Sequence, residues 1–302
     1  MEDATGTVLN GIHVSVFALS DRGRVRKNNE DNFAICNLTT GEVGITPTVL
    51  RHVVGQRGSL FLVADGMGGE ASGEVASQIC SVTVPKRLYE NLKTLDTVSE
   101  ANFVLLLREA IEFANQIIYQ SAQSNPDHRG MGTTTTAAAL FGPHLFVGQV
   151  GDSRAYLFRN NQAIQLTKDQ TFLNYLAEIG AEVPADPETD SRRSILTQAV
   201  GSSETVDVRV TYTGVSQGDR ILLCSDGLYN MVKMPELLSI ANRQEGLAET
   251  CRMLIDKANE NGGTDNITVI LAEFTGTGLP PVDPAAVAEP REFSEEDFKT
   301  PS

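Results

Sequence analysis

The chain has 302 residues, of which 41% are hydrophobic and 21% are charged, the composition of an ordinary globular protein. Its formal net charge of -15 argues against a nucleic-acid partner, because phosphate backbones are bound by clustered lysine and arginine. No apolar stretch reaches the ~18 residues that cross a membrane, and the start lacks the features of a signal peptide, so we expect a cytoplasmic protein without membrane contacts.

Short apolar runs bounded by polar breaks predict a series of β-strands. They lie at about residues 12–19, 32–38, 60–64, 133–142, 144–150, 153–159, 162–166, 207–213, 219–225 and 267–274. The runs on either side of the turn Arg159-Asn160-Asn161 should form a hairpin, because two strand-like runs are joined there by a short polar turn.

Three longer stretches carry apolar residues at helical spacing. The first begins near Ala71, the second runs from Ser99 to about Ala122, and the third covers about residues 246–261. Thr97 and Glu100 have the spacing of a capping box at the start of the second helix. Many strands with few, long helices predict an α+β layered sandwich rather than a regular alternation of strands and helices.

The last part of the chain differs in composition from the rest. From residue 276 it is rich in proline and acid but poor in large apolar side chains. Such a segment cannot bury enough apolar surface to offset the entropy of ordering it. We therefore predict one domain over residues 1–275 and a disordered acidic tail over residues 276–302.

Five aspartates stand where an apolar run gives way to a polar break: Asp31, Asp65, Asp152, Asp226 and Asp265. A buried strand that ends in an acid delivers that acid to the rim of its sheet, so several such ends can converge. Clustered carboxylates stay ionised only if a cation lies between them. No histidine lies next to these acids, and the four scattered cysteines are interpreted as reduced core thiols. An all-oxygen site favours Mg²⁺ or Mn²⁺ over Zn²⁺.

Six sequence blocks surround these acids and occur in a definite order. They are Ser20 to Asp31, Val63 to Gly69, Gly130 to Thr134, Val150 to Arg154, Cys224 to Leu228 and Gly263 to Val269. Each block alone is common turn chemistry. Together, over about residues 12–274, they resemble the metal-dependent Ser/Thr protein phosphatases (PPM, type 2C), specifically the bacterial branch.

The resemblance implies two packed antiparallel β-sheets flanked by helix pairs, a four-layer α-β-β-α sandwich, with a mobile flap at about residues 170–199. It implies hydrolysis of phosphoserine and phosphothreonine monoesters on proteins by a metal-activated water, in opposition to Ser/Thr kinases. The expected partners of a monomeric enzyme are phosphorylated proteins, among them a cognate kinase and its substrates. A catalytically inactive phosphate sensor or scaffold of the same fold is the alternative. Residues 39–58 are interpreted as an exposed insertion, with a substrate-contacting loop as the alternative.

The resemblance also assigns the acids to two tightly bound Mn²⁺ or Mg²⁺ ions and a weaker third ion. The expected metal residues are Asp31, Asp65, Gly66 through its carbonyl, Asp152, Asp226 and Asp265, supported by Glu30 and Asn266. Asp65 is expected to bridge the tight pair, with Asp226 and Asp265 on one of its ions. Asp31 and Glu30 are expected to act mainly through bound waters. The catalytic set is then Asp31, Asp65, Asp226 and Asp265.

Three further positions follow from the resemblance. Arg26 stands where the family has an arginine that grips the substrate phosphate, and a guanidinium fork suits two phosphate oxygens. Asp152 matches the acid that in bacterial relatives binds the third ion together with the acid at Asp226. Met67 and Glu70 occupy places where other members carry histidines, so the proton donor to the leaving oxygen is open, with a water on the third ion as our candidate.

Overall fold

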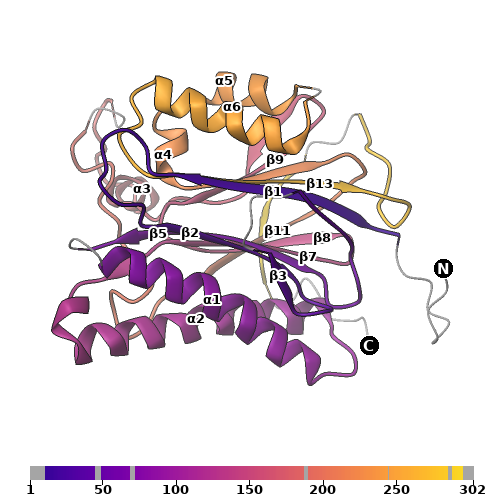
Figure 1. The fold of residues 1–302 in the computed structure, drawn as a ribbon, viewed down its shortest axis with the longest axis horizontal. Coiled ribbons are helices and arrows are strands. Elements are labelled where there is room, and N and C mark those ends of the chain that lie inside the picture. Colours follow the sequence, from indigo (N-terminus) through magenta and orange to yellow (C-terminus); the bar gives the residue numbers. More distant parts are fainter. Residues whose placement is uncertain are drawn as a thin grey trace.

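The computed structural model describes residues 11–44, 49–68, 72–186, 190–243, 245–284 and 288–294. These residues form four layers, in which two β-sheets face each other and helices cover the outer face of each sheet (Figure 1). This arrangement confirms the predicted α+β sandwich of two antiparallel sheets flanked by helix pairs. Among the described residues, no helix has the length and apolar character needed to span a membrane.

The first sheet has six strands in the order β10-β9-β12-β13-β1-β4. Their bounds are β1 His13–Asp21, β4 Leu50–Val53, β9 Arg154–Arg159, β10 Gln162–Gln165, β12 Arg220–Cys224 and β13 Ile267–Thr275. β9 and β10 form the predicted hairpin. Its turn residues Asn160 and Asn161 have φ angles of 50° and 58°, the left-handed backbone that asparagine tolerates better than most residues.

The second sheet runs β14-β11-β8-β7-β5-β2-β3, with β6 paired to β5. Its strands are β2 Asp31–Asn37, β3 Glu42–Gly44, β5 Ser59–Met67, β6 Gly132–Thr133, β7 Thr135–Phe141, β8 His144–Val150, β11 Arg209–Gly214 and β14 Arg291–Glu292. In β5, Leu60 and Leu62 pack towards the helices, whereas Phe61 and Val63 pack between the sheets. Burial on both faces explains why this strand reads as a continuous apolar run rather than an alternating one.

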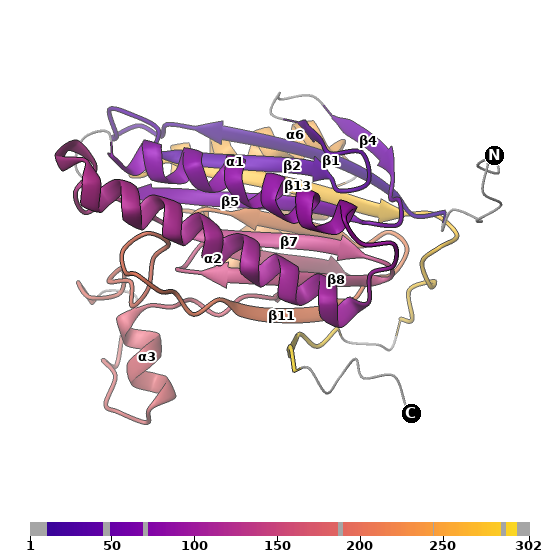
Figure 2. The same cartoon turned by 90° about the horizontal axis from the view of Figure 1, so that it is seen from below.

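Helices α1 (Ser72–Lys93) and α2 (Glu100–Ser124) lie side by side on the second sheet (Figure 2). The first sheet is covered by α4, α5 and α6, which span Asp226–Tyr229, Met234–Ala241 and Leu247–Glu260. A short 3-10 turn, Pro126–His128, follows α2, and α3 (Phe172–Glu178) stands away from the four layers (Figure 2). The spacing of apolar residues thus predicted α1, α2 and α6, but not α3, α4 or α5.

The start of α2 differs from the predicted capping box. Ser99, not Thr97, is the N-cap, and its hydroxyl accepts a hydrogen bond from the backbone N–H of Asn102 across 3.2 Å. A capping box requires Glu or Gln three residues after the cap, and here that position is Asn102. The prediction built on Thr97 and Glu100 is therefore wrong, although the helix itself begins within one residue of the expected place.

The described side chains of residues 39–58 are mostly exposed or half-buried, as expected for an exposed insertion, but the segment also contains two short strands. The segment extends both sheets, because β3 pairs with β2 in the second sheet and β4 pairs with β1 in the first. It lies beyond Asn37, at the opposite end of β2 from Asp31. The segment is therefore far from the acid that begins β2, and the alternative of a substrate-contacting loop has no support in its position.

The described tail residues differ from a disordered segment. β14 pairs with β11, and the amide of Phe293 donates to the carbonyl of Val210 across 2.8 Å. Leu279 and Phe293 are 3% and 9% exposed, so few apolar residues suffice to fasten the tail to the domain. The division of the chain at residue 275 stays a prediction.

Candidate metal centre

The five predicted aspartates lie at one end of the sandwich. Asp31 begins β2 and is paired with Asp65 near the end of β5, both in the second sheet. Asp226 is the first residue of α4 and lies two residues after the end of β12. Asp265 lies two residues before β13, which pairs with β12 in the first sheet. Asp152 lies in the connection from β8 to β9, between the sheets. Because the end of one antiparallel strand lies beside the start of its neighbour, acids from both sheets meet at this end.

The pKa values of Asp65 and Asp226 are strongly affected by burial and by the other acids. Burial and the charges of Asp31 and Asp226 raise the pKa of Asp65 well above its ordinary value. Burial and the charges of Asp152 and Asp265 likewise raise the pKa of Asp226 well above its usual range. Both side chains nevertheless keep part of their surface open to solvent. Acids that repel one another at a partly open site are arranged for a multiply charged cation.

Asp31 carries the clearest sign that a cation fits this site. The side chain is buried, and burial raises its pKa to about 6. One carboxylate oxygen, Oδ2, accepts a hydrogen bond from the hydroxyl of Ser225 across 2.7 Å. The other, Oδ1, is buried and has no hydrogen-bond partner in the described part of the chain. A buried oxygen without a donor is costly unless an ion or an ordered water meets it.

Gly66 lies where no side chain fits. A Cβ added there would lie 2.2 Å from the carbonyl oxygen of Gly73 and 2.6 Å from that of Glu30. The amide of Gly66 donates to the Glu30 carbonyl across 3.1 Å, and the hydroxyl of Ser77 donates to the same oxygen across 2.5 Å. These contacts hold the main chain before Asp31 against the end of β5. Packing alone thus requires this glycine, and the role of its carbonyl at a metal stays a prediction.

Asn266 ties the loop before β2 to the start of β13. Its side-chain oxygen accepts from the amide of Glu30 across 2.9 Å. Its side-chain nitrogen donates to the carbonyls of Arg22 and Asn28, each across 2.9 Å. Oxygen and nitrogen are therefore both engaged with main chain. The residue supports the site by fixing the loop that carries Arg26 and Glu30.

Arg26, the predicted phosphate-binding residue, reaches the acidic cluster. Its Nη2 donates to Oδ2 of Asp265 across 2.6 Å, while its side chain is 52% exposed. The second oxygen of Asp265 accepts from the amide of Asn266 across 2.9 Å. A phosphate gripped by this guanidinium would therefore lie beside Asp265.

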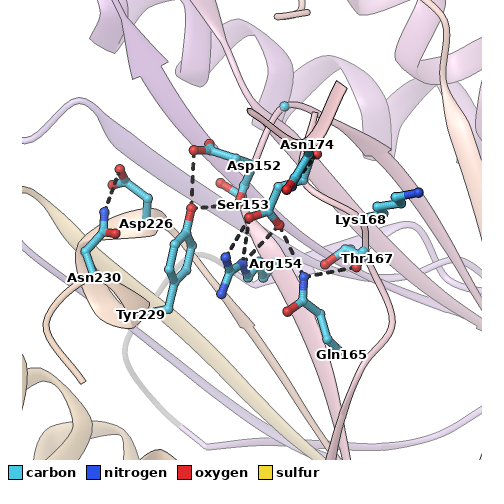
Figure 3. Close-up of polar contacts among 12 residues, drawn as sticks. Asp152, Ser153, Arg154, Gln165, Thr167, Lys168, Asn174, Asp226, Tyr229 and Asn230 are labelled. Atoms are coloured by element: carbon cyan, nitrogen blue, oxygen red, sulfur yellow. Dashed lines mark hydrogen bonds and ion pairs between the residues drawn. The ribbon is translucent and has the colours of Figure 1, made fainter. Parts of the chain in front are cut away.

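Tyr229 and Asn230 are polar neighbours of the acids that the sequence did not reveal. The hydroxyl of Tyr229 donates to the carbonyl oxygen and to Oδ2 of Asp152, across 3.1 and 3.2 Å (Figure 3). The side chain of Asn230 donates to Oδ2 of Asp226 across 3.1 Å. Burial raises the pKa of Asp152 to about 6, and the Tyr229 hydroxyl partly offsets that rise.

The acids do not form a complete set of ligands by themselves. Within the described ranges, no three Asp, Glu, His or Cys side chains come close enough together to hold one metal ion. The site expected from the sequence divides the acids between several ions and completes each with a carbonyl or with water, as Mg²⁺ commonly requires. The fit of the site to cations thus rests on the unpartnered oxygen of Asp31 and on the mutual repulsion of the acids.

A cavity of about 300 Å³ opens beside Asp152 and Asp226. The flap segment, residues 170–199, contributes Leu173 and Asn174 to its lining, and the stretch from α4 to α5 contributes the opposite wall. The predicted flap therefore borders the site, although residues 187–189 lie outside the described residues, as does Glu70. Arg192, an exposed residue of the flap segment, forms an ion pair with Asp190 at 2.9 Å, and the mobility of the flap stays a prediction.

Comparison with known proteins gives consistent matches. The sequence model of the family described as protein phosphatase 2C matches residues 49–271. The chain is 35% identical over 254 residues to the serine/threonine phosphatase stp of Listeria welshimeri, covering 84% of this chain and 93% of that protein. It is 36% identical over 257 residues to the serine/threonine protein phosphatase PstP of Mycobacterium tuberculosis, covering 85% of this chain and 44% of that protein.

Two solved structures extend the comparison to the fold. The serine/threonine phosphatase of S. agalactiae has a TM-score of 0.74 at 28% identity, covering 86% of this chain and 99% of that chain. The catalytic domain of PstP in complex with two manganese ions has a TM-score of 0.69 at 33% identity, covering 87% of this chain and 99% of that chain.

Proposed function

The chain belongs to the protein phosphatase 2C family and is a serine/threonine protein phosphatase, and we propose that the acidic cluster is where it hydrolyses phosphoserine and phosphothreonine monoesters. The observation that carries this proposal is the buried, unpartnered oxygen of Asp31 among acids that raise one another's pKa. Such a cluster repels an anionic phosphate unless cations reverse its charge. The site therefore becomes a phosphate site only when it is loaded with metal.

Two Mn²⁺ or Mg²⁺ ions and a weaker third ion would supply that charge. The ligands would be Asp31, Asp65, the carbonyl of Gly66, Asp226 and Asp265, supported by Glu30 and Asn266, with Asp152 joining Asp226 at the third ion. Divalent ions in such a site lower the pKa of a bound water towards ~7 and offset charge on the phosphoryl oxygens. The two manganese ions of the PstP catalytic domain, at 33% identity, support this assignment.

The side chains of the protein then bind and orient the substrate. Arg26 pairs with Asp265 through one edge of its fork, and a cation at Asp265 would compete for that carboxylate. The released fork can donate to two phosphate oxygens and align the ester in the site. Met67, at the end of β5, is 39% exposed but has no proton to give, so the chain must protonate the leaving oxygen from another group.

The substrates are phosphorylated proteins, and we propose that they include a Ser/Thr kinase and the proteins that this kinase phosphorylates. An open site at the end of the sandwich suits a phosphorylated loop of a folded protein. The net charge of -15 disfavours a nucleic-acid substrate. A monomeric state and a cytoplasmic location complete the proposal.

Release of phosphate from a phosphothreonine peptide, with Mn²⁺ or with excess EDTA, tests the proposal. Asp65→Asn and Asp226→Asn should each lose about 10³-fold or more in activity, because each replaces a negatively charged ligand of the ions by a neutral amide. Asp96→Asn, on the exposed connection between α1 and α2, is the matched control and should keep the wild-type rate.

Full turnover in EDTA, or near-normal activity of either site variant, would refute the assignment. An inactive wild-type protein that still binds Mn²⁺ and phosphate would favour the alternative, a catalytically inactive phosphate sensor of the same fold.

A further inference from the structure

Tyr229 lies between two of the acids at the site. It ends α4, the helix that Asp226 begins, and Figure 3 shows its ring between Asp226 and Arg154 with the hydroxyl directed at Asp152. That hydroxyl has two acceptors on Asp152, the backbone oxygen at 3.1 Å and Oδ2 at 3.2 Å. A hydroxyl has a single proton, so the two acceptors share it. The contact thereby fixes the carboxylate of Asp152 relative to its own main chain.

The ring of Tyr229 is fixed in turn by Arg154. The guanidinium carbon of Arg154 lies 3.6 Å from the ring centroid, a distance at which the cation attracts the ring face. Nε and Nη2 of Arg154 donate to the two carboxylate oxygens of Asp169 across 2.9 and 2.6 Å, and Nη1 donates to the hydroxyl of Tyr156 across 3.0 Å. The side chain of Asp169 is only 8% exposed, so this fork is shielded from water and rigid.

Asp169 also stands at the root of the flap segment. The next residue, Gln170, donates its amide to the carbonyl of Gly151 across 2.9 Å and accepts from the amide of Gly151 across 2.8 Å through its side chain. Gly151 directly precedes Asp152. The flap root therefore contacts the turn of Asp152 in two ways. Gln170 makes two hydrogen bonds to Gly151, and the Arg154–Asp169 fork holds the tyrosine ring that reaches Asp152.

We propose that Tyr229 is a positioning residue for Asp152, held in place by Arg154 and Asp169 at the root of the flap. The inference rests on the proposed function, in which Asp152 binds the weaker third ion. A carboxylate that must hold an ion with few partners loses affinity when it is free to turn. Removal of a side chain that orients a metal ligand typically weakens metal binding 10- to 100-fold.

Calorimetric titration with Mn²⁺ tests the role of Tyr229. Tyr229→Phe keeps the ring for Arg154 and removes only the hydroxyl. It should weaken the third ion by about 10-fold, leave the tight pair unchanged, and raise the Mn²⁺ concentration that gives half-maximal turnover by a similar factor. KM for a phosphopeptide at saturating Mn²⁺ should stay at the wild-type value. Tyr119→Phe, on α2, is the control, because it removes a tyrosine hydroxyl without changing Asp152, Arg154 or Asp169.

A merely structural role would give a different result, namely a lower melting temperature in EDTA with unchanged affinity for every ion. Arg154→Lys should weaken the third ion in the same direction, because lysine has neither the fork nor the planar stacking group. The double variant should lose less than the sum of the two single losses, since both act through one hydroxyl. Full additivity would overturn the proposed connection, and Arg154→Lys gives the same readout if Tyr229→Phe does not fold.

Asp152→Ala separates the inference from its premise. If this variant binds as many ions as the wild type, the third site and the role of Tyr229 both fall. If it loses the weak ion while Tyr229→Phe binds that ion normally, only the role of Tyr229 falls.

Discussion

At the scale of single residues, Arg26 combines a close contact with an open position. Its guanidinium donates to Asp265 across 2.6 Å, yet half of the side chain is exposed. Ion pairs this open typically contribute ~0–1 kcal/mol, so little free energy opposes their exchange for another partner. Arg26 is therefore available to a phosphate once a cation occupies Asp265.

Arg26→Ala should raise KM and lower kcat/KM by about 2 to 4 kcal/mol, because a charge-assisted contact with the phosphate is lost. Affinity for Mn²⁺ should stay the same or rise, since a competitor for Asp265 is removed. Arg24→Ala, in the same loop and exposed, is the control and should behave like the wild type. Steady-state kinetics with a phosphopeptide decide, and unchanged kinetics in Arg26→Ala would reduce it to a surface charge.

The sequence predicted the acidic residues of the site better than the residues that hydrogen-bond to them. Each aspartate follows or precedes an apolar strand, so local pattern alone placed all five at strand ends. Ser225 and Tyr229 were missed because their partners are remote: Ser225 contacts Asp31 across 194 residues of sequence, and Tyr229 contacts Asp152 across 77. No local pattern marks a hydroxyl whose acceptor is brought to it only by the completed fold.

At the scale of elements, length and recognisable turns decided what could be predicted. The long strands and α1, α2 and α6 carry enough periodic residues to be recognised. β3 and β4 have three and four residues, and they become strands because they pair with the edges of sheets that already exist. β14 has only two residues and depends in the same way on β11. Tertiary pairing, which is invisible in a local pattern, creates such elements.

The tail gives the prediction at this scale. Phe293 is 9% exposed and belongs to the apolar cluster between the second sheet and its helices. Phe293→Ala should lower the free energy of unfolding by about 2 to 3 kcal/mol, less than in a central core because a chain end can readjust. Phe293→Leu retains most of the apolar contact and should lose much less. Urea titration measures both, and equal stability of Phe293→Ala and the wild type would show that the tail adds nothing.

At the scale of the whole molecule, the acids make stability depend on pH. Burial raises the pKa of both Asp31 and Asp152 from 3.8 to about 6, and burial together with neighbouring charges raises the pKa of Asp65 and Asp226 well above 3.8. Between about pH 4 and pH 6, the folded state without metal therefore binds more protons at these carboxylates than the unfolded state does. Its stability from these groups is fully present below their unfolded pKa and is lost as the pH rises through the folded pKa.

We therefore expect the free energy of unfolding in EDTA to fall as the pH is raised from about 5 to about 8. Urea titrations at several pH values measure this slope. Asp152→Asn removes one of the titrating groups and should make the dependence on pH less steep. This variant distinguishes the effect of the acids from that of His52, whose pKa is lowered by burial and whose contribution to stability changes with pH in the opposite direction. Saturating Mn²⁺ should remove most of the dependence, because ions replace protons among the carboxylates. The expectation would be contradicted if the free energy of unfolding in EDTA rose with pH. It would also be contradicted if Asp152→Asn showed the same pH dependence as the wild type.

The acids of the candidate centre are divided between the two sheets, with Asp31 and Asp65 on one and Asp226 and Asp265 on the other. Neither sheet can assemble the proposed ligands alone, so a newly made chain would bind its ions only after the sandwich has closed. Ions held by the proposed ligands would cross-link the two sheets, because they would bind carboxylates of both. The concentration of free metal would then set the free energy of unfolding as well as the rate of catalysis, since a ligand that binds only the folded state stabilises it in proportion to the logarithm of its concentration.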